Sequence, residues 1–407
     1  MRNCRLCGAS LTHTFVDLGM SPPCESYLDA DQLDQGETFY PLHVRICSQC
    51  LLVQLPAYIP AEDIFTHYAY FSSYSDSWVR HAETFVEGAV DRLGLDESSF
   101  VVEVASNDGY LLQHTVARGI RSLGIEPATN VAEAAEARGV PTEVLFLGKE
   151  TGEKVAAEHG AADLVVANNV FAHVPDIVDF SRGLRALLAD DGHLSIEIPH
   201  LLRLIEGREY DTIYHEHFSY VSLLTTQRVL ATAGLTVVDV EELPTHGGSL
   251  RTWSMPSEHA TPPSAAVAKV LADEARAGLH TLEGHGGFAD SVAQVRDDLL
   301  EFLISARREG KRVVAYGAPG KGNTLLNHCG IRSDLVEFSV DRNPFKHGKF
   351  LPGTHIPIHP VEALAEARPD YVLVMPWNLR KEIGDQLAYV RDWGGQLVVA
   401  LPQLEIY

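Results

Sequence analysis

Positive charge is scarce in this sequence. Its 407 residues include 32 lysines and arginines against 55 aspartates and glutamates, which gives a formal net charge of −23 at pH 7. No block of lysine or arginine interrupts this excess, so we expect no nucleic-acid partner. An anionic small molecule would have to be held by local hydrogen-bond donors.

Long apolar stretches are also missing. No segment reaches the roughly 20 apolar residues needed to cross a bilayer, and the opening residues 1–4 lack the apolar core of a signal peptide. We therefore expect a cytoplasmic protein with no membrane partner. The content of 45% hydrophobic and 21% charged residues is ordinary for a globular protein, and the length predicts two or three domains.

Cysteine is rare, but its spacing is informative. Four of the six cysteines form two C-x-x-C pairs, Cys4/Cys7 and Cys47/Cys50. In a cytoplasmic chain such pairs favour metal ligation over disulfides, and a redox pair would be expected within a βαβ unit. Four thiolates suit one tetrahedral zinc ion in a closed site that has no position for substrate. We therefore predict one structural zinc in an N-terminal module over residues 1–75.

Beyond this module, hydrophobic runs alternate between strand and helix periods. The pattern predicts a doubly wound, Rossmann-like α/β domain over residues 76–256, a helical connection over 257–309 and a smaller Rossmann-like α/β domain over 310–407. The strand-like runs are Phe100–Val104, Ser122–Ile125, Leu164–Ala167, His193–Ile198, Leu235–Val240 and Ser249–Ser254 in the first domain, and Arg312–Tyr316, Leu335–Val340, Tyr371–Met375 and Leu397–Leu401 in the second.

Small and acidic residues follow the first two strands of the central domain. The first strand runs into E-V-A-S-N-D-G, residues 103–109, ahead of a helix whose amino end offers N–H groups to a ligand. Glu126 ends the next strand, where an acid typically accepts hydrogen bonds from both hydroxyls of a ribose. Asn168 ends a third strand at the same edge of the sheet. We expect a nucleotide-type cofactor there, and a solvated carboxylate at the end of a strand is the alternative for Glu126.

Titratable side chains crowd into one later segment. Residues 210–220 read Y-D-T-I-Y-H-E-H-F-S-Y, so Tyr214, His215, Glu216 and His217 stand together just beyond a strand. Histidine suits proton transfer near neutral pH. A polar loop without chemistry is the alternative, and a metal site at the two histidines would lack the helical H-E-x-x-H pattern. His173 follows Asn168 closely in sequence. We expect it to face the reaction centre, and a capping or buried histidine is the alternative.

A second loop of small residues opens the C-terminal domain. The strand that ends at Tyr316 is followed by G-A-P-G-K-G-N, residues 317–323, and then by a helix. Its three glycines allow close backbone approach, the helix amino end favours an anion, and Lys321 adds a positive charge. The spacing is not that of a Walker loop. A plain strand–helix turn with an exposed lysine is the alternative.

Six motifs in a fixed order give the sequence a specific resemblance. Together they resemble the nucleotide-sugar C-methyltransferases of antibiotic deoxysugar pathways, and the similarity covers essentially the whole chain. A typical methyltransferase has glycine at three alternating positions of the cofactor loop, whereas Ala105 and Asn107 replace two of them here, as in that family. The motifs are Cys4-x-x-Cys7, Cys47-x-x-Cys50, Glu103-Val-Ala-Ser-Asn-Asp-Gly109, Tyr214-His-Glu-His-Phe-Ser-Tyr220, His246-Gly-Gly-Ser-Leu-Arg251 and Gly317-Ala-Pro-Gly-Lys-Gly-Asn323.

The resemblance implies a reaction and a set of roles. Family members use S-adenosylmethionine to methylate a thymidine-diphosphate (TDP) keto-sugar, usually at C-3′ beside a C-4′ ketone. By matching motif, His217 would be the base, with Tyr214 and Glu216 beside it, while Tyr68 and His173 would approach the sugar. The cofactor would contact Glu103, Ala105, Asn107, Asp108, Gly109, Glu126, Phe146, Leu147 and Asn168, and the sugar nucleotide would contact Tyr316, Gly317, Lys321, Asn323 and Arg251.

Two other functions remain compatible with these residues. A nicotinamide-dependent oxidoreductase could use the same kind of sheet, although the first loop lacks G-x-G-x-x-G. The protein could also be a zinc-stapled module that binds a nucleotide-sugar without turnover. The cluster of titratable residues at Tyr214–His217 argues against this function. Whatever its function, the protein is expected to be a monomer or a small homo-oligomer.

Overall fold

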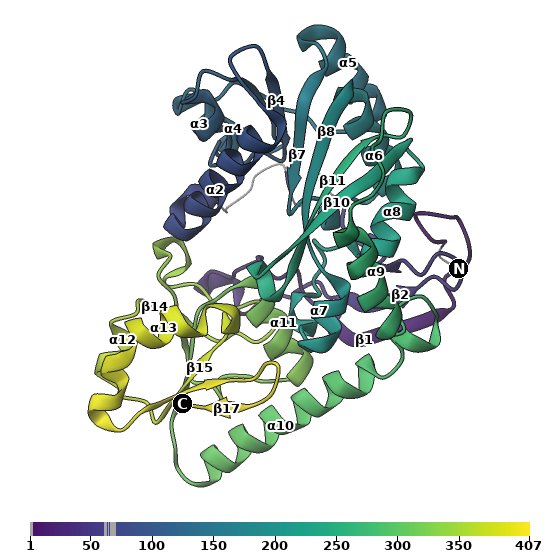
Figure 1. Ribbon diagram of the computed structural model, residues 1–407. Coiled ribbons are helices and arrows are strands. Elements are labelled where there is room, and N and C mark those ends of the chain that lie inside the picture. Colours follow the sequence, from purple (N-terminus) through teal and green to yellow (C-terminus); the bar gives the residue numbers. More distant parts are fainter. Residues whose placement is uncertain (1–2, 61–62, 64, 66–70) are drawn as a thin grey trace. The chain divides into compact units, whose positions relative to one another are not determined.

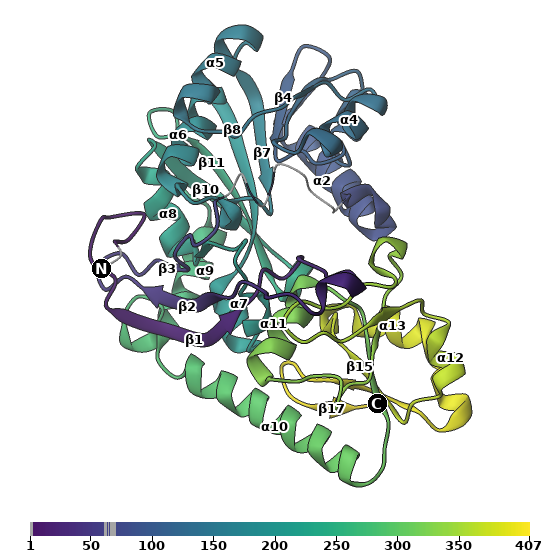
Figure 2. The same cartoon turned by 180° about the vertical axis from the view of Figure 1, so that it is seen from behind.

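The chain forms two compact units, each assembled from three segments. The computed structural model describes residues 3–60, 63, 65 and 71–407, which Figures 1 and 2 show from opposite sides. The first unit comprises Met1–Thr12, Cys47–Leu201 and Phe218–Gly284, and the second comprises His13–Ile46, Leu202–His217 and His285–Tyr407. This grouping differs from the four consecutive domains expected from sequence, because the stretch between the two cysteine pairs belongs to the second unit.

The first unit contains the expected doubly wound sheet. Its strand order is β10-β11-β8-β7-β4-β5-β6, parallel except that β11 runs antiparallel to both of its neighbours. The chain order reverses between β4 and β7, and the carboxyl ends of strands at such a switch point are where ligands bind. The strands are β4 (Phe100–Val104), β5 (Arg121–Ile125), β6 (Thr142–Glu143), β7 (Ala162–Asn168), β8 (Leu188–Pro199), β10 (Leu235–Leu243) and β11 (Ser249–Pro256).

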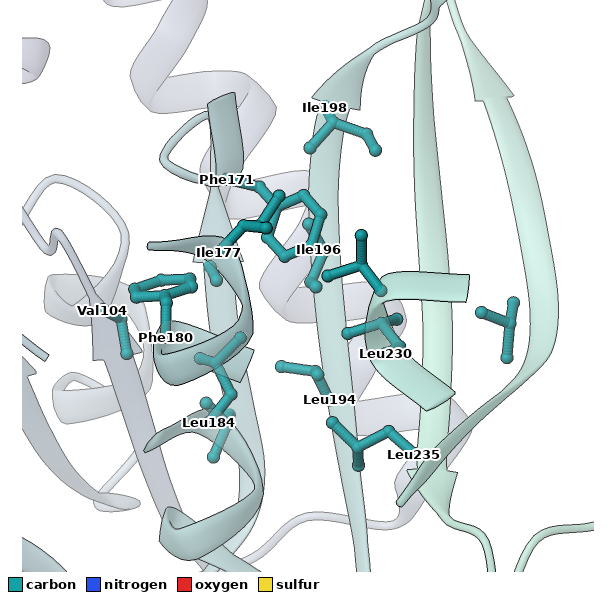
Figure 3. Close-up of a cluster of buried hydrophobic side chains, with 14 of the residues drawn as sticks. Val104, Phe171, Ile177, Phe180, Leu184, Leu194, Ile196, Ile198, Leu230 and Leu235 are labelled. Atoms are coloured by element: carbon teal, nitrogen blue, oxygen red, sulfur yellow. The ribbon is translucent and has the colours of Figure 1, made fainter. Parts of the chain in front are cut away.

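Helices cover both faces of this sheet because alternate strand residues point to opposite sides. On β4, Val104 packs in a buried cluster with Phe180 of α6 and Leu230 of α8, which Figure 3 shows. Val101 belongs to a second cluster, together with Phe85 of α2. The helices of this unit are α2 (Asp76–Leu93), α3 (Leu112–Val116), α4 (Thr129–Ala137), α5 (Lys149–His159), α6 (Ile177–Leu187), α8 (Leu223–Ala231) and α9 (Ala265–Arg276).

The cysteine pairs are built into the first unit's core. Cys4, Cys47 and Cys50 are buried in the same hydrophobic cluster as Val104. Directly after the second pair, the short strand β3 (Val53–Gln54) pairs antiparallel with β9 (Ser219–Tyr220). The metal site therefore belongs to the first unit instead of forming a detached module.

The second unit contains a smaller sheet of the same winding. Its order is β14-β13-β12-β15-β16-β17, with only β17 antiparallel. The expected strand at residues 335–340 is confined to its last two residues. The strands are β12 (Val313–Tyr316), β13 (Ser339–Val340), β14 (Ile358–His359), β15 (Tyr371–Val374), β16 (Gln396–Val399) and β17 (Glu405–Ile406), and the helices are α7 (Leu201–Glu206, which begins one residue before this unit), α10 (Phe288–Arg308), α11 (Gly320–Cys329), α12 (Ala363–Ala367) and α13 (Arg380–Gln386).

The stretch between the cysteine pairs forms a hairpin of β1 (His13–Ser21) and β2 (Tyr40–Ile46) with a long connection. Phe15 stacks on Phe288 at the start of α10, with ring centroids 4.7 Å apart. In the connection, the hydroxyl of Tyr27 donates to the carbonyl of Ala318 at 2.6 Å. These contacts explain why the stretch belongs to the same unit as the C-terminal sheet.

Helices composed of the described residues are all too short or too polar to traverse a lipid bilayer.

Candidate functional site

The two cysteine pairs adopt the same tight turn. The amide of Gly8 donates to the carbonyl of Cys4, and the amide of Leu51 donates to that of Cys47, both at 2.9 Å. The residue after each pair is left-handed, with φ of 75° at Gly8 and 62° at Leu51. Glycine adopts this conformation at little cost, so Leu51 carries backbone strain that the second turn must offset.

The four sulfur atoms fit one tetrahedral zinc ion. All lie within 4.8 Å of one another, with Cys4 and Cys50 3.4 Å apart and Cys7 and Cys47 3.5 Å apart. Zinc–sulfur bonds of about 2.3 Å place tetrahedral ligands about 3.8 Å apart. Gln54 Nε2 also donates to Cys4 Sγ at 3.1 Å, as expected of a thiolate. The predicted quartet is confirmed, and zinc would be held there without an open coordination position.

The cofactor loop keeps a glycine-like backbone without the glycines. Ala105, Asn107 and Gly109 all have positive φ, of 55°, 50° and 75°. These are the three positions at which a typical methyltransferase has glycine. A left-handed alanine costs about 1–2 kcal/mol, and such strain tends to persist where the surrounding structure requires the conformation.

Glu126 is fixed against this loop. Its Oε2 accepts from the amide of Asn107 at 3.0 Å and its Oε1 from the amide of Ala128 at 2.9 Å. Burial raises the pKa of the Glu126 carboxyl, and the two amides oppose that shift. The carboxylate is thus presented at the carboxyl end of β5, beside the switch point.

Buried polar atoms without partners mark the same edge. Within the described part of the chain, Glu103 Oε2 and Asn168 Oδ1 are enclosed and make no hydrogen bond. Burial, followed by the charge of Glu126, raises the pKa of the Glu103 carboxyl well above its usual value. Buried polar groups are nearly always satisfied, so these atoms fit a ligand such as the amino-acid part of S-adenosylmethionine.

The other candidate cofactor residues have varied surroundings. The carboxylate of Asp108 bonds Ser73 Oγ at 2.5 Å and Arg138 Nη1 at 2.7 Å, so its side chain holds the loop. Beyond β6, Phe146 is 40% exposed, whereas Leu147 packs against the core. The roles of these residues in cofactor binding stay predictions.

We expect Glu126→Ala to weaken S-adenosylmethionine binding by about 10–150-fold, because hydrogen bonds to a charged group contribute about 1.5–3 kcal/mol. Titration calorimetry measures this directly. Glu133→Ala, at an exposed position of α4, removes the same charge and should bind normally. Unchanged affinity in Glu126→Ala would reject the assignment.

The reactive segment lies in the second unit up to His217. Helix α7 separates it from β8, so it does not follow the strand directly as expected. After the short helical turn Tyr210–Thr212, the amide of His217 donates to the carbonyl of Tyr214 at 2.9 Å. His217 Nδ1 is 2.7 Å from the carbonyl of Thr212. A carbonyl accepts only, so Nδ1 carries the proton and the basic lone pair is on Nε2.

The neighbours of His217 differ in character. His215 is buried against the ring of Tyr40, with centroids 5.7 Å apart, and burial lowers its pKa to about 4. It is therefore a neutral core side chain. Burial, and then the charge of Glu25, raise the pKa of Glu216 to about 7. Tyr214 lies beside His217, with ring centroids 4.0 Å apart.

A metal site at these two histidines finds no support in the described residues. The groupings of three or more metal-ligating side chains found among them include neither His215 nor His217. The tautomer of His217 instead suits proton removal.

Arg251 has a different task from the one expected. It bonds Glu197 at 2.8 Å and Glu241 at 3.2 Å, all within the first unit, and its side chain is only 8% exposed. Because this guanidinium already forms ion pairs with two carboxylates, it is poorly placed to bind a diphosphate as well. Sequence reasoning also missed Glu197 and its partner His81, 2.8 Å apart. The sequence signal that could have indicated Glu197 is the position of this carboxylate near the end of an apolar strand.

Of the two further residues expected to approach the sugar, only His173 lies among the described residues. His173 ends the short helix Phe171–His173 of the first unit, after Asn168. The loop is pinned by the amide of Phe218, which donates to the carbonyl of Ala172 at 2.7 Å. Tyr68 lies outside the described residues.

The loop at residues 317–323 joins β12 to α11 as expected. Gly317 has φ of 88°, and a side chain there would meet Pro376 at 2.7 Å. Lys321 Nζ donates to Asn378 Oδ1 at 3.0 Å and lies 5.2 Å from the centre of the Trp377 ring. Asn323 is fully buried, and its Nδ2 finds no partner in the described part of the chain. Tyr316 is turned to Gln386, 3.2 Å from its hydroxyl.

The two acidic groups near this loop have raised pKa values, so that Glu209 is largely protonated at neutral pH while Asp211 is largely ionised. Burial, with the charge of Asp211, raises the pKa of Glu209 to about 8. Burial raises that of Asp211 to about 6, and Lys321 opposes both shifts. The cation of Lys321 therefore faces less negative charge than the sequence suggests, which suits an anionic ligand.

Comparison with solved structures shows only distant likeness. The PH0226 protein from Pyrococcus horikoshii OT3 is 14% identical, covers 48% of this chain and 97% of its own, and has a TM-score of 0.38. Magnesium protoporphyrin IX methyltransferase from Synechocystis PCC 6803 is 13% identical, covers 43% and 82%, and has a TM-score of 0.35.

Comparison by sequence is decisive. Family models match a zinc binding domain at residues 4–65, a methyltransferase domain at 78–240 and a C-methyltransferase C-terminal domain at 244–402. C-methyltransferase NovU from Streptomyces niveus is 38% identical over 402 residues, covering 98% of this chain and 95% of that protein. The chain therefore belongs to the S-adenosylmethionine-dependent C-methyltransferases with an N-terminal zinc-binding domain, the family that its motifs predict.

Proposed function

We propose that this enzyme methylates C-3′ of a TDP-linked 4-keto-deoxysugar in antibiotic deoxysugar synthesis. One observation carries the proposal: Thr212 fixes the tautomer of His217 so that Nε2 can accept the proton next to the ketone. Family membership leaves no support for the nicotinamide oxidoreductase or for a binding protein without turnover.

The base and the proposed nucleotide loop are joined within the second unit. Thr324 of α11 donates to the carbonyl of Ile213 at 3.0 Å, next to the reactive turn. The indole of Trp377 donates to the carboxylate of Asp211 at 2.8 Å, and Asp211 directly precedes Thr212, whose carbonyl is bonded to His217. A nucleotide held at α11 would thus be fixed relative to His217, which lets binding energy position the reacting carbon.

The second unit repeats a feature of the cofactor unit. Asp341 follows β13 as Glu126 follows β5, and its Oδ2 accepts from the amide of Ala318 at 2.7 Å while Oδ1 accepts from that of Asn343 at 2.8 Å. Glu126 makes the equivalent pair of bonds to Asn107 and Ala128. This parallel supports a nucleotide at each switch point.

In the proposed reaction, each of these residues has a separate role. His217 takes the proton, and an enolate forms on the sugar. A hydroxyl or imidazole donor, from Tyr214, His173 or Tyr68, stabilises the oxyanion. S-adenosylmethionine supplies the methyl group, which the carbanion accepts in line.

Labelled S-adenosylmethionine and a panel of keto-sugar nucleotides test this function. We expect transfer to the TDP-linked 4-keto-sugar, with the methyl group located at C-3′ by NMR. Transfer only to oxygen or nitrogen acceptors, or only to sugars without a ketone, would contradict the proposal.

We expect Lys321→Ala to raise KM for the sugar nucleotide by about 10–100-fold, because a charge-assisted hydrogen bond to a phosphate is lost. Affinity for S-adenosylmethionine should stay the same. Lys381→Ala, at an exposed position of α13, serves as the control of equal charge change. Weakened cofactor binding with intact sugar-nucleotide binding would mean that the two sites are reversed.

A further inference from the structure

Arg5 lies between the two cysteines of the first pair, and its guanidinium is turned inward. Its Nη2 donates to the carbonyl of Leu55 at 2.5 Å, and its Nη1 lies 3.5 Å from the carbonyl of Val174 and 3.5 Å from Ser219 Oγ. The guanidinium also lies 5.5 Å from the centre of the buried Phe218 ring. One side chain of the zinc turn thus contacts three separate segments of the first unit.

These segments meet around the loop that carries His173. The amide of Phe218 donates to the carbonyl of Ala172 at 2.7 Å, and the amide of Leu55 donates to the carbonyl of Phe218 at 3.0 Å. Arg5 reaches the same loop at Val174. The backbone on both sides of His173 is therefore held by a network that includes Arg5.

Arg5 makes no direct ion pair with a carboxylate in the described part of the chain, and its Nε is buried without a hydrogen bond. Burial lowers the pKa of its guanidinium to about 10, and the charges of Cys4, Tyr220 and Asp176 oppose that shift, with Cys4 the largest of the three. A zinc ion with four thiolates carries a double negative charge, so the metal cluster at Cys4 would add to this compensation. Gln54 links the two, since its Oε1 accepts from the Arg5 amide at 3.0 Å and its Nε2 donates to Cys4 Sγ.

We propose that the zinc site positions the His173 loop through Arg5, whose cation is buried against the loop because the zinc–thiolate cluster balances it. Arg5 is thus a positioning residue, and its importance for turnover rests on the proposed role of His173. The zinc ion would then contribute to catalysis without touching substrate. Loss of zinc would leave an unbalanced buried cation and release the loop.

The test compares Arg5→Met, Arg5→Lys and Arg228→Met in the full-length, zinc-loaded enzyme. Arg228 of α8 donates to the carbonyl of Cys50 at 2.8 Å. It supports the second cysteine turn and, among the described residues, forms no hydrogen bond with the His173 loop, which makes it a matched control. Hydrogen exchange at the amides of His173 and Phe218 reports on the loop itself, independently of any methyl acceptor.

We expect Arg5→Met to accelerate exchange at these two amides by about tenfold and to lower kcat without changing affinity for S-adenosylmethionine. Arg5→Lys should recover most of both. Arg228→Met should lose zinc faster to a chelator, with normal exchange at both amides while zinc is bound.

Unchanged exchange in zinc-loaded Arg5→Met would overturn the proposal. Accelerated exchange with normal kcat would support the anchoring and would instead remove His173 from the reaction. If Arg5→Met does not fold, Arg5→Gln, which also removes the charge, takes its place, and unchanged exchange at the two amides in that zinc-loaded variant would equally overturn the proposal.

Discussion

Replacing His217 with asparagine is expected to lower kcat by about 10²–10⁴-fold, the usual contribution of a general base, while both ligands still bind. The amide of asparagine can donate to the carbonyl of Thr212, as Nδ1 of His217 does. It has no basic lone pair to replace that of Nε2. The substitution therefore separates proton removal from the integrity of the turn.

Deuterium exchange from solvent into the carbon next to the ketone measures this step without methyl transfer. The wild-type enzyme should catalyse it, and the variant should not. His280→Asn, at an exposed position, controls for the change of residue type. Exchange at the normal rate in His217→Asn would show that another group is the base, with His173, Tyr68 and Tyr214 as the next to be tested.

Replacing Cys47 with serine should abolish stable zinc binding and destabilise the first unit. Loss of a direct ligand should weaken zinc binding by more than the roughly 10–100-fold typical of outer contacts, hence by at least about 3 kcal/mol. Because metal binding and folding are coupled, this appears as lost stability. Cys47 is fully buried in the core of the first unit, so its effect should spread beyond the turn.

Elemental analysis and thermal unfolding measure the two consequences. Wild-type protein should hold zinc near one equivalent, and Cys47→Ser should hold little and melt earlier. Cys329→Ser changes another buried cysteine outside the quartet and should keep its zinc. Normal unfolding of zinc-free wild-type protein would contradict a structural role for the metal.

Local patterns predicted the elements of this fold well. Strands such as Phe100–Val104 agree with the structure to the residue, because a short buried run between turn signals has few alternatives. The pattern could not show that residues 13–46 belong to the same unit as the C-terminal sheet, since that depends on contacts such as Tyr27 with Ala318, nearly 300 residues away in sequence. Register and partner choice depend on packing that no window of sequence contains.

The site was predictable where chemistry repeats at fixed spacing. Four cysteines in two pairs could only be brought together, and they are. The ion pair of Arg251 could not be foreseen, because Glu197 is 54 residues away on an adjacent strand; the role of Arg251 toward the sugar nucleotide stays a prediction. The left-handed backbone at Ala105 was equally hidden, because alanine rarely adopts that conformation, whereas asparagine at position 107 tolerates it.

The alternation of segments between the two units limits how this enzyme can be taken apart or recombined. Its six segments require five crossings of the chain from one unit to the other. A single cut after residue 309 would leave the hairpin β1–β2 and the reactive turn on the wrong fragment. If the second unit holds the acceptor as proposed, an exchange of acceptor specificity between relatives needs three donor segments transplanted together, residues 13–46, 202–217 and 285–407, and a simple C-terminal swap should give insoluble hybrids.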